Sequence, residues 1–153
     1  MKLRQSPRLK EFAYTGPFVY HLTFVTRGRL PIFQSGEAVQ TCLESLRTAC
    51  ERRGFDILAY CFMPDHVHLL IAGQEGSSLR DFARHFKQIS GYKFKRERGA
   101  SLWQISYYDH VLRRDEDIRQ VAAYIWDNPV RAGMVESRLD YAFSGPREVM
   151  EQA

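Results

Sequence analysis

The segment from residue 55 to residue 72 constrains the fold most, because its pattern predicts a tight β-hairpin. Its two halves, Phe55–Met63 (FDILAYCFM) and His66–Ala72 (HVHLLIA), are rich in the apolar, aromatic and β-branched residues that favour strands. Pro64 and Asp65 between them are typical of a turn. Strands joined by so short a turn pair antiparallel, so the sheet of this protein must contain an antiparallel pair.

Two further strands and three helices are expected around this hairpin. Strands are predicted over residues 18–27 and within the segment ISYYDHVLR, residues 105–113. Helices are predicted from Ser35, as N-cap, to Gly54, from residue 79 to beyond residue 94, and from Asp115 to about Asp127, where Asn128-Pro129 ends the last one. Apolar residues at three- and four-residue steps predict the buried faces, which are Val39, Cys42, Leu43, Leu46 and Cys50, then Leu79, Phe82, Phe86, Ile89 and Phe94, and finally Ile118, Val121, Ala122 and Ile125.

The element order is therefore strand, helix, two strands, helix, strand, helix. Strands that meet in hairpins, with helices segregated to one face, give an α+β sandwich, of which the ferredoxin-like antiparallel sheet is the natural candidate. A chain of 153 residues without repeats or a linker fits one domain, residues 1–153. We expect the basic, polar residues 1–15 to form a loosely held N-terminal arm.

The charge and the cysteine content indicate the cellular compartment of the protein better than they indicate its activity. A net charge of +4 and a pI of about 9.1 suit a polyanionic partner, but an ordinary basic protein has the same values. Cys42, Cys50 and Cys61 follow no zinc-binding spacing, and reduced core thiols are typical of proteins in a reducing compartment. With no secretory signal and no membrane-spanning run in the sequence, we expect a soluble, cytoplasmic protein.

His66 and His68 are the first candidates for chemistry. Residues i and i+2 of a strand project from the same face, so the two imidazoles stand side by side while Val67 points the other way. Such a pair can chelate a divalent ion through neutral ring nitrogens, although two histidines at this spacing are also common as a hydrogen-bonded pair. Burying an unpaired polar ring in an apolar strand is costly, which favours a ligand. The remaining histidines follow no such pattern and are expected to be structural; they are His21, His85 and His110.

Tyr124 and Asn128 are the second pair of candidates. They are four residues apart and therefore neighbours on one face of the third predicted helix. A tyrosine hydroxyl can attack a phosphate when its proton is removed and the phosphate charge is neutralised, and an asparagine oxygen can join a metal site. The alternative is purely structural, with Tyr124 as a core aromatic residue and Asn128 as a helix-terminal cap.

The polar face of the second predicted helix is basic. Its cations interleave with Tyr92 and Phe94, a mixture that suits phosphate contact and base stacking in single-stranded nucleic acid. The same charges are also typical of a merely solvated helix face. The candidate DNA-binding residues are Arg80, Arg84, Lys87, Lys93 and Lys95 on this helix, with Arg113 and Arg131 on either side of the third.

Three stretches of the chain resemble one family. CFMPDHVHLLI is similar to the HUH signature of the single-tyrosine transposases, in which a strand carries two histidines separated by one bulky apolar residue. LWQISYYDHVLR and YIWDNPVRAGMV look like the second half of the REP-associated tyrosine transposases, a subgroup of the insertion-sequence 200/605-like enzymes. The resemblance covers residues 18–146, and its motifs occur in the family's order.

This resemblance implies a ferredoxin-like HUH fold and a transposase that cuts and rejoins single-stranded DNA next to hairpins through a 5′-phosphotyrosine. Carried over by position, Tyr124 matches the nucleophile, His66 and His68 match the metal-binding pair, and Asn128 matches the third ligand. The implied cofactor is Mg²⁺ or Mn²⁺, the implied partner is single-stranded or hairpin DNA, and the assembly is a monomer or a homodimer.

Two other interpretations stay open on the sequence. The first is a domesticated protein that still binds hairpin DNA without significant cleavage. The second is a zinc or iron enzyme that acts on small molecules through His66 and His68, for which the basic helix offers no support.

Overall fold

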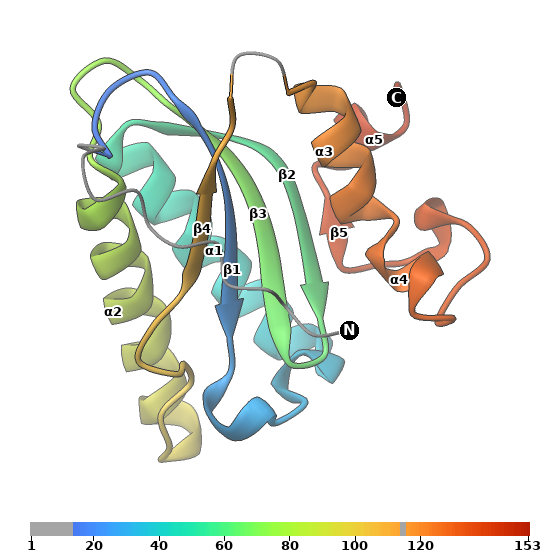
Figure 1. Ribbon diagram of the computed structural model, residues 1–153. Helices are drawn as coiled ribbons and strands as arrows, with labels where there is room; N and C mark the ends of the chain where they lie inside the picture. The colour runs from blue at the N-terminus through green and yellow to red at the C-terminus, as the bar shows by residue number, and fades with distance from the viewer. Residues whose placement is uncertain (1–13, 114–115) are drawn as a thin grey trace.

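A five-stranded antiparallel sheet runs through the part of the chain that the computed structural model describes, residues 14–113 and 116–153 (Figure 1). The predicted N-terminal arm falls almost wholly outside these residues. The strands lie in the order β4-β1-β3-β2-β5, so the predicted hairpin forms the centre of the sheet. Their bounds are β1 Val19–Val25, β2 Phe55–Met63, β3 His66–Gly73, β4 Tyr108–Val111 and β5 Ser144–Gly145.

The register of the central hairpin assigns each residue to a face. Cys61 pairs with His68 and Met63 with His66, so these four side chains share one face. A bulge between Ile57 and Ala59 shifts the pairing, since Ile57 pairs with Ile71 and Ala59 with the next residue back, Leu70. The sequence predicted the hairpin correctly, and β2 has the predicted bounds.

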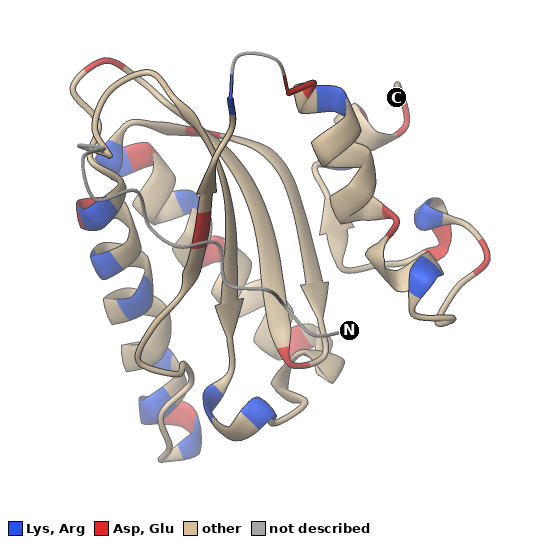
Figure 2. Cartoon of the chain, in the orientation of Figure 1, with Lys and Arg blue, Asp and Glu red and all other residues tan. Residues whose placement is uncertain are grey.

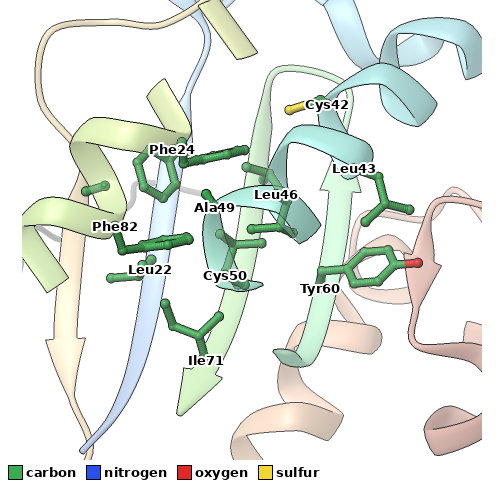
Figure 3. Packing of buried hydrophobic residues seen from close by; sticks show 14 of the residues in the cluster. Leu22, Phe24, Cys42, Leu43, Leu46, Ala49, Cys50, Tyr60, Ile71 and Phe82 are labelled. Atoms are coloured by element: carbon green, nitrogen blue, oxygen red, sulfur yellow. The ribbon is translucent and has the colours of Figure 1, made fainter. Parts of the chain in front are cut away.

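Helices α1 (Gly36–Arg53) and α2 (Leu79–Arg98) cover one face of the sheet. Both have the local signals that start and stop helices: Ser35 and Ser78 accept N-cap hydrogen bonds, and Gly54 and Gly99 end the helices in the left-handed region. Figure 3 shows side chains of both helices meeting those of the strands in this core. Its fully buried members include Tyr20, Leu22, Phe24, Leu46, Phe62, Leu69, Ile71, Phe82 and Phe86.

Helix α3 (Ile118–Trp126) lies on the opposite face, which corrects the expectation that all helices share one side (Figure 1). The physical reason is that β2 and β3 are apolar on both faces, so the second face also needs a cover. There Ala59, Cys61 and Leu70 pack against Ala122, Ile125 and Trp126 in a second buried cluster.

Two details of α3 also differ from expectation. The helix begins at Ile118 after an Asp117 N-cap, and Ile118 is 42% exposed instead of facing inward, since the first turn extends past the covered strands. The predicted end of the helix is correct, because α3 stops at Trp126 with Asp127 as its C-cap. A separate short helix, α4 (Asn128–Arg131), then begins with Pro129 in its first turn, where proline is tolerated.

Short elements complete the described chain, and the sequence did not predict them. They are three 3-10 turns, η1 (Arg27–Arg29), η2 (Ile32–Gln34) and η3 (Arg138–Asp140), and helix α5 (Arg147–Met150). The segment after α4 returns to the sheet and adds β5 to the edge of β2. No helix within residues 14–113 and 116–153 is both long and apolar enough to cross a membrane.

Candidate active site

His66 and His68 project from the face of β3 that α3 partly covers. Their rings meet edge to face, with centroids 4.9 Å apart. His68 is 2% exposed. His66 lies at the end of the strand beside the turn, and its side chain is 14% exposed. The two imidazoles are therefore the adjacent pair that strand alternation predicted, one deeply buried and one at the rim.

Asp65 in the hairpin turn orients the His66 ring. Its Oδ1 lies 2.7 Å from Nδ1 of His66, and its Oδ2 accepts a hydrogen bond of 3.2 Å from Arg29. Burial alone would raise the pKa of Asp65, but the hydrogen bonds and charges of His66 and Arg29 lower it. With Nδ1 engaged by a carboxylate, Nε2 is the ring nitrogen of His66 that remains for a ligand, an arrangement common in metal sites.

Strand β1 orients the His68 ring from the other side. Nδ1 of His68 lies 3.0 Å from Thr23 Oγ1 and 3.2 Å from His21 Nε2. Nε2 of His68 is buried and has no hydrogen-bond partner. Since buried polar atoms are almost always paired, this nitrogen points to a ligand.

Burial keeps both imidazoles neutral, as metal ligands must be. Desolvation lowers the pKa of His66, against the opposing effect of Asp65. Desolvation also lowers the pKa of His68 well below its ordinary value, helped by repulsion from His21, His66 and Arg131. Both rings thus have a lone pair available at neutral pH.

Helix α3 presents Tyr124 on the same side of the sheet as the imidazoles. The side chain is 43% exposed, which rules out the alternative of a core aromatic residue. Arg131 lies against it, with its guanidinium carbon 3.8 Å from the ring centroid and its Nη2 donating a hydrogen bond of 2.7 Å to the Tyr124 carbonyl oxygen.

Asn128 follows at the junction of α3 and α4. It is 6% exposed, and its amide nitrogen is buried without a partner. The residue that caps the end of α3 is Asp127, so Asn128 is not the helix-terminal cap that the structural alternative required. Rotation of the amide by half a turn exchanges its nitrogen and oxygen, so this group can present an oxygen to a ligand.

The three candidate donors, two imidazole nitrogens and one amide oxygen, could coordinate a divalent cation and leave positions open. No group of three or more His, Cys, Asp or Glu side chains placed to hold a metal occurs among the described residues. Two neutral imidazoles and one amide oxygen would leave both charges of such an ion uncompensated by its ligands. A site of this kind is suited to an anionic substrate group such as a phosphate.

The structure separates most of the predicted DNA-binding residues from this site. Arg80, Arg84, Lys93 and Lys95 are exposed along α2, which packs on the other face of the sheet (Figure 2). Lys87 bonds the carbonyl oxygens of Gln104 and Ile105 at 2.9 and 2.7 Å, and thus holds the loop before β4. Arg113 is exposed just after β4, and Arg131 alone of the seven contacts Tyr124.

Three residues near the site were not identified from the sequence in these roles. His21, expected to be only structural, contacts His68, and Asp65, which was assigned to the turn, contacts His66. Trp126 fixes the end of α3 by donating a hydrogen bond of 2.9 Å to the Gly145 carbonyl oxygen in β5. Alternation along β1 places His21 and Thr23 on one face, but only the register with β3 shows which histidine they contact.

Comparisons of the sequence and of the structure with known proteins both find transposases. A family model described as IS200-like transposase matches residues 16–128. A REP-associated tyrosine transposase of Escherichia coli is 32% identical over 60% of this chain and 54% of its own length. The ISDra2 transposase TnpA of Deinococcus radiodurans is 29% identical over 73% of this chain and 84% of its own.

A solved structure of a REP-associated tyrosine transposase bound to a REP hairpin superposes on this chain with a TM-score of 0.78. The alignment covers 96% of this chain and 87% of that one, at 23% identity. At this identity the match shows that the two proteins share a fold.

Proposed function

This chain belongs to the IS200-like transposase family, and from that membership we propose that it cleaves and rejoins single-stranded DNA next to a hairpin. Tyr124 is the nucleophile in this proposal. His66, His68 and Asn128 would hold a divalent ion beside it. The product of the first step is a 5′-phosphotyrosine.

The unpartnered Nε2 of His68 is the observation that carries the proposal. It is a buried ring nitrogen on the face of the sheet that also receives α3. A binding protein without catalysis would not need this unpaired nitrogen, because leaving a buried polar atom unpaired costs about 1–3 kcal/mol. It would also not need an exposed phenol on the covering helix.

The reaction proceeds by exchange of one phosphodiester for another. The Tyr124 oxygen loses its proton and attacks phosphorus, the P–O3′ bond breaks, and the leaving 3′ oxygen takes up a proton. Attack by a different 3′-hydroxyl on the phosphotyrosine reverses these changes and joins new ends. No external energy is required, since each step replaces one phosphate ester by another.

Charge at the scissile phosphate is the main barrier, and two features of the site address it. Arg131, stacked on the nucleophile, puts a fixed positive charge where the phosphate must approach the phenol. Bound Mg²⁺ or Mn²⁺ would withdraw charge from the phosphate and orient it.

Recognition of DNA is assigned to a second surface. The relative in the solved complex is bound to a REP hairpin, and we extend hairpin recognition to this chain. The exposed cations of α2 (Arg80, Arg84, Lys93 and Lys95) supply phosphate contacts, and Tyr92, which is 66% exposed among them, offers a stacking surface.

The test is formation of a covalent protein–DNA adduct. The protein is incubated with Mn²⁺ and a single-stranded DNA that contains a hairpin, and the products are separated on a denaturing gel. We expect an adduct with the wild type and none with Tyr124→Phe or His66→Ala. Tyr92→Phe, which removes the hydroxyl of another exposed tyrosine, is the matched control and should retain it. Persistence of the adduct in Tyr124→Phe would refute this assignment of the nucleophile.

A further inference from the structure

Strand β1 places two polar side chains against the buried ring of His68. Thr23 pairs directly with His68 in the register, and His21, two residues earlier, pairs with Leu70 and reaches His68 diagonally. Both approach the same ring atom, Nδ1, at 3.0 and 3.2 Å. The rings of His21 and His68 have their centroids 5.3 Å apart.

The proton on His68 decides whether this residue can bind a cation. A neutral imidazole has one N–H and one lone pair. A lone pair at Nε2, the atom without a protein partner, requires the proton to be on Nδ1. If the proton is on Nε2, the ring presents an N–H to the site and cannot be a ligand there.

His21 and Thr23 can each adapt to both of these forms, the hydroxyl by rotation and the imidazole by a change of tautomer. A hydroxyl can donate or accept by rotation, so Thr23 fits both tautomers of His68 equally well. The Nε2 atom of His21 either accepts from His68 or donates to it, according to its own tautomer. The two arrangements of the His21–His68 pair therefore have opposite consequences at Nε2 of His68.

Burial favours the arrangement that exposes the lone pair. A proton on Nε2 of His68 would be a buried N–H without an acceptor, because that atom has no partner. Orphaned buried N–H groups are rarer in proteins than under-used acceptors. With the proton on Nδ1, the N–H donates to His21 or Thr23 and no donor is left unpaired.

We propose that His21 is a positioning residue for the metal centre, which accepts the Nδ1–H of His68 and thereby holds Nε2 as a lone pair for a divalent cation. This inference rests on the proposed function, because it assumes that His66 and His68 receive a cation. This role gives His21 a task that neither the fold nor the core requires, because Leu22 and Phe24 already anchor the strand from its other face.

The experiment measures tautomers and cation binding without DNA. The ¹⁵N shifts of the ring nitrogens of His68, assigned by comparison with His68→Ala, distinguish N–H from bare nitrogen in the metal-free protein. Titration calorimetry with MnCl₂ gives the affinity of the wild type, His21→Leu and His21→Gln. His85→Leu is the matched control, because His85 lies on α2, on the other face of the sheet, and accepts a hydrogen bond from Arg53.

We expect His68 to have its proton on Nδ1 in the wild type. His21→Leu should weaken Mn²⁺ binding by about 10- to 100-fold, as loss of a partner to a ligating histidine does. His21→Gln, whose terminal amide oxygen can accept in place of Nε2, should restore most of the affinity, and His85→Leu should bind as the wild type does.

Two results would overturn the inference: a proton on Nε2 of His68 in the wild type, or wild-type affinity in a folded His21→Leu. If His21→Leu does not fold, the wild-type tautomer and the His21→Gln affinity decide. Failure of the DNA-adduct test with intact Mn²⁺ binding would refute the proposed function alone, whereas a wild type that binds no Mn²⁺ would refute both.

Discussion

The guanidinium of Arg131 is stacked on the ring of Tyr124, 3.8 Å from its centroid, and is bonded to the carbonyl oxygen of the same residue. The contact spans the junction of α3 and α4, so it depends on the chain continuing in helical form past Asn128-Pro129. It limits the rotation of an exposed phenol and puts a cation beside it.

Replacing Arg131 should therefore impair the reaction more than the fold. We expect Arg131→Met to slow adduct formation by about 100-fold, the typical effect of removing one charge-stabilising donor. Its free energy of unfolding should change by less than about 1 kcal/mol, because a cation–π contact at an exposed site contributes little. Single-turnover cleavage and urea unfolding measure the two quantities.

Arg131→Lys and Arg119→Met complete this series. Lys retains the charge without the planar stacking group, so its rate should fall between those of the wild type and Arg131→Met. Arg119 has a side chain 94% exposed at the start of α3, and its loss removes one positive charge from the neighbouring helix. An equal slowing in Arg119→Met would mean that only net charge matters.

Trp126 should hold the C-terminal segment against the sheet. Trp126→Phe removes the hydrogen bond to Gly145 and part of a buried ring, and we expect a loss of about 1–3 kcal/mol in unfolding free energy. Trp103→Phe is the matched control, since Trp103 donates to Ser90 in the other core at 2.8 Å. Faster hydrogen exchange in β5 should appear in Trp126→Phe only; equal exchange in both variants would contradict this role.

The cations of α2 should determine the salt dependence of DNA binding. We expect the double variant Arg80→Gln/Arg84→Gln to bind hairpin DNA more weakly, with the slope of log K against log salt reduced by about 0.7 for each lost contact to a single strand. Lys87→Gln should instead lower stability, because Lys87 holds two loop carbonyl groups. Fluorescence anisotropy at several salt concentrations, with a melting curve for each variant, distinguishes these effects. An unchanged slope in the double variant would remove α2 from the DNA surface.

The three thiols should be unreactive in the folded protein. Burial raises the pKa of Cys50 to about 12 and of Cys61 to about 11, and it raises that of Cys42 further. At pH 8 each is therefore protonated, and the thiolate is the reactive form. We expect iodoacetamide to modify them only as fast as the protein unfolds, followed by mass spectrometry. Rapid modification of Cys61 under native conditions would show that the α3 face opens.

Local patterns in the sequence determined most of the framework. Strand alternation placed His66 and His68 on one face, and the residues that start and stop helices fixed α1 between Ser35 and Gly54, because these signals act over only a few residues. The hairpin followed from its turn for the same reason. The family also followed from these short motifs, and the match over residues 16–128 confirms it.

Relationships between distant segments were decided only by the tertiary structure. The side of the sheet that α3 covers depends on the apolar surface that the other helices leave open. The contact between His21 and His68, which are 47 residues apart in the sequence, depends on the register of β1 against β3. Pairing across such a distance is set by the packing of the whole core, which no local pattern encodes. The sequence therefore identified the candidate ligands and nucleophile, and the fold alone shows which side chains orient them.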